Sequence, residues 1–139
     1  MTHDRQLTVA SLLAILLMTV HVSDDIRRGI SPPGADNIGG VAIFLVWLTG
    51  TLLLAGRPAG YVIMFLGGIF GAAMPVLHMT GSRYPAIVQS GGGFFFVWTL
   101  FAVGTVGAFA AILAARALWR RPIPGTGVGE RSNTLGAKT

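Results

Sequence analysis

Residues 93–119 read GFFFVWTLFAVGTVGAFAAILAARALW, an apolar run whose one charged side chain, Arg116, lies near its end. A run of this length and composition is typical of a helix that crosses a lipid bilayer. Further apolar stretches occupy about 7–22, 38–55 and 60–78. The sequence therefore predicts an all-α integral membrane protein with four transmembrane helices in an up-down-up-down bundle.

The composition agrees with lipid as the main solvent for the side chains. Of the 139 residues, 53% are hydrophobic and only 11% are charged, which is more apolar surface than a soluble domain of this size can bury. The formal net charge of +5 comes mainly from loops and tails, so we interpret it as a topology signal and expect no nucleic-acid partner. The chain has no Cys, which excludes disulfides, thiolate ligands and cysteine nucleophiles.

Turn residues delimit the predicted spans. The helical pattern of the first span continues past Val22 toward Gly29, a candidate C-terminal cap. The short turn at 56–60 allows only an antiparallel hairpin between the second and third spans. We predict a transmembrane domain over 1–119 and, because Gly, Pro and small polar residues dominate it, a disordered cytoplasmic tail over 120–139.

The distribution of basic residues predicts the orientation. Five arginines flank the spans on one side and three on the other, the larger set being Arg5, Arg57, Arg116, Arg120 and Arg121 and the smaller Arg27, Arg28 and Arg83. Since basic loops favour the cytoplasm, both termini are predicted to be cytoplasmic. Residues 19–25 contain no small-x-small cleavage site, so we interpret the first span as uncleaved and expect a bacterial inner-membrane protein.

A weak internal repeat relates the two halves of the chain. The first span ends in Val20-His21-Val22-Ser23 and the third in Leu77-His78-Met79-Thr80. The second span then contains Phe44-Leu45-Val46-Trp47, and the fourth contains Phe95-Phe96-Val97-Trp98. Such a duplication would make the bundle two tandem helical hairpins in the same orientation. It would also place His21 and His78 at one depth in the membrane.

The outer ends of the first and third spans therefore hold the candidate chemistry. His21, His78, Asp24, Asp25 and Met18 gather there, and two imidazoles with carboxylates can bind a divalent metal such as Zn²⁺, whereas a thioether would favour copper. Paired histidines on two helices can also ligate haem b. The plainer interpretation, with no cofactor, is that these side chains hydrogen-bond water, lipid headgroups or backbone at the membrane surface.

Small residues mark the predicted helix contacts. Glycines recur on the third and fourth spans where neighbouring helices can approach closely, at Gly67, Gly68, Gly71, Gly104 and Gly107. No nucleophile elbow, phosphate loop or dinucleotide fingerprint is present. The sequence thus favours a non-enzymatic membrane component that associates through these glycines with itself or other membrane subunits; the alternative is a metal- or haem-binding protein that uses His21 and His78.

Overall fold

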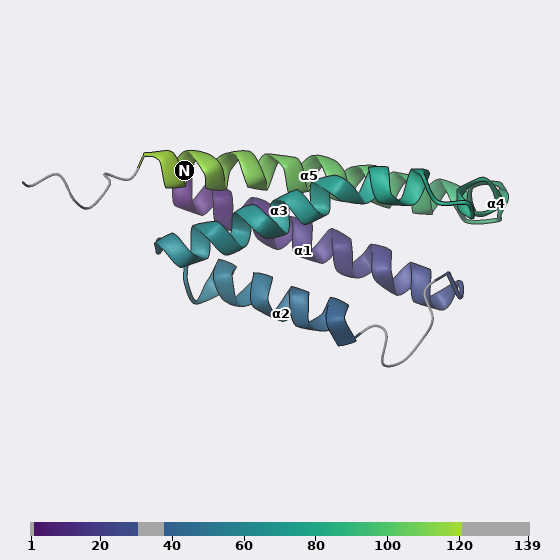
Figure 1. Cartoon of the computed structure of the whole chain (residues 1–139), viewed down its shortest axis with the longest axis horizontal. Coiled ribbons are helices and arrows are strands. Elements are labelled where there is room, and N and C mark those ends of the chain that lie inside the picture. Colours follow the sequence, from purple (N-terminus) through teal and green to yellow (C-terminus); the bar gives the residue numbers. More distant parts are fainter. Residues whose placement is uncertain (1, 31–37, 121–139) are drawn as a thin grey trace, which may run out of the picture.

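A computed structural model describes residues 2–30 and 38–120. Within these ranges the chain is all-helical, with α1 (His3–Arg27), α2 (Ile38–Leu52), α3 (Pro58–Met79), α4 (Tyr84–Gln89) and α5 (Gly93–Trp119), and no strand. Figure 1 shows the four longer helices side by side and the short α4 at one end of the molecule. The predicted all-α class is confirmed. The predicted tail lies, apart from Arg120, outside the described residues.

Three helices are long and apolar enough to cross a membrane: α1 with 25 residues, α3 with 22 and α5 with 27. The fourth apolar helix, α2, has only 15 residues and ends at Leu52 rather than at the predicted residue 55. Its last turn opens because the N–H groups of Leu53 and Leu54 both donate to the carbonyl oxygen of Thr49. The first helix extends to Arg27 as the pattern predicted, followed by Gly29 with a φ of 68°.

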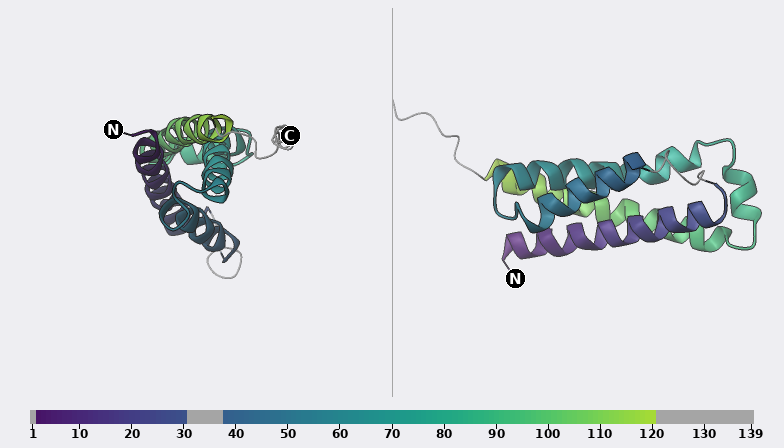
Figure 2. Two further views of the ribbon diagram at one scale, coloured as in Figure 1. Left: turned by 90° about the vertical axis from the view of Figure 1, so that its left-hand side faces the viewer. Right: turned by 90° about the horizontal axis from the view of Figure 1, so that it is seen from below.

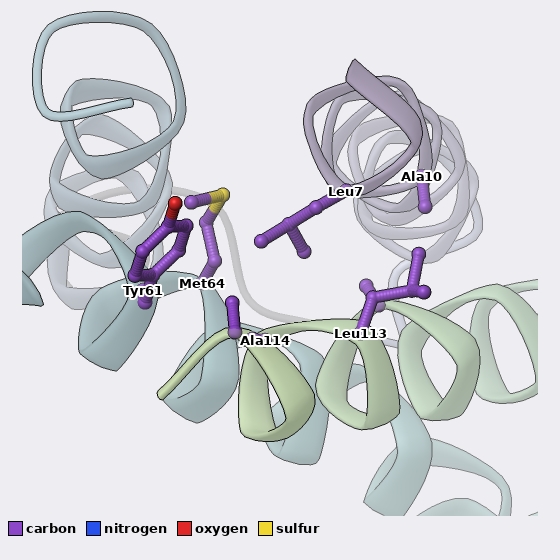
Figure 3. Close-up of a cluster of buried hydrophobic side chains, with 8 residues drawn as sticks. Leu7, Ala10, Tyr61, Met64, Leu113 and Ala114 are labelled. Carbon is purple, nitrogen blue, oxygen red and sulfur yellow. The ribbon is translucent and has the colours of Figure 1, made fainter. Parts of the chain in front are cut away.

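Two core clusters fix the directions of the three long helices. At one end, Leu7 and Ala10 of α1 pack with Tyr61 and Met64 of α3 and with residues 110–117 of α5 (Figure 3). At the other end, Met18 and Met74 pack with Phe96 and Leu100. Therefore α1 and α3 run parallel to each other, and α5 runs antiparallel to both.

The most extensive helix contact joins α3 and α5, and glycines lie in it. A Cβ atom on Gly107 would lie 2.8 Å from the nitrogen of Ala72 and 2.9 Å from the carbonyl oxygen of Gly68. A Cβ atom on Gly104 would meet the ring of Pro75, and one on Gly67 would meet the Trp47 indole of α2. All five predicted packing glycines are buried between helices of this one chain. Contact of these glycines with other subunits stays a prediction; within this chain they pack against neighbouring helices.

Helix α2 lies against the side of the bundle formed by α1 and α3, as the view along the helices shows (Figure 2). A fully buried polar chain connects α2 to α1: the Trp47 indole donates to Ser11 over 2.8 Å, and the Ser11 and Thr51 hydroxyls lie 2.7 Å apart. Thr51 donates its proton to the carbonyl oxygen of Trp47, so Ser11 donates to Thr51. Every polar hydrogen of the Trp47, Ser11 and Thr51 side chains therefore has an acceptor.

Candidate metal centre

Three side chains with metal-binding atoms converge at the end of the bundle where α1 and α3 terminate. His21 and Asp25 lie one turn apart on α1, and His78 lies in the last turn of α3. The Asp25 Oδ2 atom is 3.8 Å from His21 Nε2 and 3.5 Å from His78 Nε2. One ligand atom from each of the three residues lies within 4.8 Å of the other two.

The two imidazoles lie in direct contact. Their ring centroids are 5.2 Å apart, and the planes meet edge to face at 75°. The Phe96 ring of α5 packs against both, with centroid distances of 5.0 Å to His21 and 5.8 Å to His78. Phe96 therefore forms an apolar wall on one side of the two histidines.

Hydrogen bonds assign the tautomer of His78. Its Nδ1 atom is 3.1 Å from the carbonyl oxygen of Met74, which can only accept. Nδ1 therefore carries the hydrogen, and in the neutral ring Nε2 keeps a lone pair directed at Asp25.

The same reasoning applies to His21. Its Nδ1 atom is 3.0 Å from the Oγ1 atom of Thr99, and the Thr99 hydroxyl donates to the carbonyl oxygens of Phe95 and Phe96 at 3.0 Å each. Because that hydroxyl has no second hydrogen, the neutral His21 ring donates from Nδ1 and keeps a lone pair on Nε2. Metal-binding histidines are commonly oriented in this way by a hydrogen bond from the other ring nitrogen.

Two atoms of the cluster lack hydrogen-bond partners although they are buried. These are His21 Nε2 and Asp25 Oδ1, on side chains that are 0% and 9% exposed. An unpartnered buried polar atom typically costs about 1–3 kcal/mol. A metal ion would bind the His21 lone pair, and ligand atoms about 2.1 Å from a tetrahedral zinc lie about 3.4 Å apart, close to the spacing found around Asp25 Oδ2.

The remaining predicted site residues lie elsewhere. Asp24 accepts a hydrogen bond of 2.6 Å from Arg28 Nε and lies 4.0 Å from Arg27 Nε. Met18 is fully buried in the apolar cluster with Met74 and Phe96. Haem ligation does not fit, because a macrocycle would have to separate two imidazoles that touch each other and the same carboxylate.

Sequence reasoning missed Thr99 and the carbonyl of Met74. Met74 gave no signal, since any helical residue offers a carbonyl. Thr99 did give one: it is a hydroxyl within an apolar span, and buried polar residues in such spans usually have a partner.

No family model, no curated protein and no solved structure matches this chain. The fold and the apolar helices define a helical protein compatible with a lipid membrane. Its specific role has to be argued from the His21, Asp25 and His78 cluster.

Proposed function

We propose that this chain is an integral membrane protein that binds one divalent metal ion of the zinc class at the outer face of a cytoplasmic membrane. His21 Nε2, Asp25 Oδ2 and His78 Nε2 are the proposed ligands. The observation that carries the proposal is the convergence of the two Nε2 atoms on one carboxylate, with both Nδ1 atoms already hydrogen-bonded elsewhere.

The outer surface of the helices supports membrane insertion. Large apolar side chains are exposed on every long helix, among them Leu16 on α1, Leu45 on α2, Leu66 on α3 and Ile112 on α5. Lipid is the solvent in which such surfaces are stable, whereas soluble monomers rarely expose apolar patches of this extent.

The parallel course of α1 and α3 supports four crossings. Between Arg27 and Pro58 the chain has to return along the whole bundle, and α2 is the described helix in that interval. Its 15 residues rise about 22 Å, which is less than the usual hydrocarbon thickness of about 30 Å. Local bilayer thinning around α2 accommodates such a mismatch at modest cost. The bias of arginines supports an orientation with both termini in the cytoplasm and the metal centre outside.

The donor set favours zinc or a similar ion over copper. All three proposed ligands are nitrogen or oxygen donors, and the thioether of Met18 is packed in the apolar core. Imidazole and carboxylate together suit Zn²⁺, whereas Cu(I) prefers sulfur.

Binding rather than transport fits the described interior of the bundle. Among the described residues, the buried polar and charged side chains other than His21 and Asp25 are Ser11, Thr51 and Thr99. All three hydrogen-bond within the protein. Ion pathways through membranes generally need ionisable or unpaired polar groups. We therefore propose that the ion enters and leaves from the outer face.

Metal binding to purified protein in lipid nanodiscs tests this proposal. Chelator-treated protein should take up one Zn²⁺ per chain by competition with a chromophoric chelator and by elemental analysis. The His21→Ala, His78→Ala double variant should lose that binding. His3→Ala removes an imidazole from the beginning of α1 and should retain it. Equal zinc content in the parent and the double variant would refute the proposal.

A further inference from the structure

We infer that the metal centre keeps a fourth coordination position, occupied by water and exchangeable for a small monovalent anion from the outer aqueous phase. The inference rests on the proposed function and specifies the class of ligand that the bound ion would take. It follows from the number of protein ligands, from the exposure of His78 and from the charges at this end of the bundle.

The described residues supply three ligands and no more. His21, Asp25 and His78 form the one group of three or more potential ligand residues found in 2–30 and 38–120. The nearest other carboxylate on α1, that of Asp24, forms an ion pair with Arg28. The Phe96 ring beside His21 has no atom that can bind a metal. Zinc ions that serve a purely structural role have four protein ligands, whereas sites with three retain a position for water or substrate.

The unpartnered oxygen of Asp25 suits a bound water. If Oδ2 binds the ion, Oδ1 remains buried without a hydrogen-bond donor. A water on the adjacent coordination position can donate a hydrogen bond to Oδ1, so both unpartnered atoms of the cluster would then have a partner.

Access to this position is from the His78 side. The His78 side chain is 24% exposed, compared with 0% for His21 and 9% for Asp25. His78 lies in the last turn of α3, followed by Thr80 and Gly81, which are exposed. Small solutes can therefore reach the ion from the end of the bundle without entering the helix core.

The local charge favours an anion. The described charged groups at this end are the carboxylates of Asp24 and Asp25 and the guanidinium groups of Arg27, Arg28 and Arg83, so three positive charges less two negative ones give +1. A divalent ion raises the sum to +3. Replacing the water by a monovalent anion lowers this charge within a partly desolvated site, where electrostatic interactions are strong.

Cobalt substitution with azide titration tests the inference. Co²⁺ should bind one per chain and give the intense visible absorption of a four-coordinate ion, and azide should shift these bands along a saturable curve. Asp36 lies between α1 and α2 in the sequence, outside the described residues, and is not among the three proposed ligands, so the Asp36→Asn variant should behave like the parent. Thiocyanate should compete with azide at the same position.

The two proposals fail in distinguishable ways. If Co²⁺ does not bind, or if the His21→Ala, His78→Ala variant binds it equally, the metal centre itself is wrong. If Co²⁺ binds through the histidines but its spectrum does not respond to azide or thiocyanate, the open position is wrong while the metal centre stands. An azide response that appears only in Asp36→Asn would identify Asp36 as a fourth protein ligand and would also overturn the open position.

Discussion

The Nδ1 atom of His21 on α1 lies 3.0 Å from the Oγ1 atom of Thr99 on α5, a residue 78 positions later in the chain. This contact fixes the rotation of the imidazole and leaves Nε2 directed at Asp25. Thr99 is thus a positioning residue for the proposed metal ligand.

Replacing Thr99 by valine should weaken metal binding without unfolding the bundle. Valine keeps the shape of the side chain but cannot accept the hydrogen bond, so the ring is no longer held in one orientation. Loss of such a supporting hydrogen bond typically lowers metal affinity about 10–100-fold. Zinc titration of Thr99→Val in nanodiscs measures this change.

Thr105→Val provides the matched control, because Thr105 is exposed on the same helix. It should bind zinc as the parent does. Equal affinity in both valine variants would show that Thr99 does not position His21.

Replacing Asp25 by asparagine and replacing Asp24 by asparagine should have different effects on zinc binding. Asp25→Asn removes the charge shared by His21 and His78 and should abolish stoichiometric zinc binding. Asp24→Asn removes the charge paired with Arg28 and Arg27, neither of which is a proposed ligand, and should leave zinc binding intact. Elemental analysis of both variants, prepared in parallel, distinguishes them; a reversed result would assign the ligand to Asp24.

The difference between Asp24 and Asp25 shows where sequence reasoning stopped. Helical spacing puts Asp24 and Asp25 three and four residues after His21, on one stripe, and puts Asp24 one turn before Arg28. Which carboxylate faces His78 depends on the rotation of α1 against α3, and that rotation is set by long-range packing such as the contact of Met18 with Met74 and Phe96.

The helices themselves were largely predictable, because long apolar runs bounded by Gly, Pro and charged residues leave few alternatives in lipid. The predicted glycines of α3 and α5 lie where these helices approach their neighbours. Their partner could not be predicted, since a small-residue surface suits a helix of the same chain and a helix of another equally well. The early end of α2 also depended on a local hydrogen-bond change at Thr49 that has no sequence signature.

Gly107→Ala, which adds one methyl group, should destabilise the bundle. Its Cβ would lie 2.8 Å from a backbone atom of Ala72 and 2.9 Å from one of Gly68, and backbone cannot move aside as a flexible side chain can. Overpacking of this kind typically costs about 1–3 kcal/mol. Reversible unfolding in mixed detergent micelles, followed by helical circular dichroism, measures the loss.

Gly40→Ala controls for the change in helix propensity. Nothing lies within 4 Å of a Cβ atom at Gly40, so alanine there should be neutral or stabilising by up to about 1 kcal/mol. Similar destabilisation by both substitutions would indicate that the contact between α3 and α5 is looser than the structure shows.

Single cysteines should report whether α2 crosses the membrane, because the parent chain contains none. We expect Ser90→Cys, between α4 and α5, to react with a membrane-impermeant maleimide in intact cells. Ala55→Cys, after α2, should react only once the membrane is opened, since the parallel α1 and α3 require the chain to return to the inner side before Pro58. Both positions are exposed, so a difference in labelling reports sidedness rather than burial. Labelling of both variants in intact cells would mean that α2 does not cross. Labelling of Ala55→Cys but not of Ser90→Cys would mean that the orientation is inverted, with the His21 and His78 centre on the cytoplasmic face.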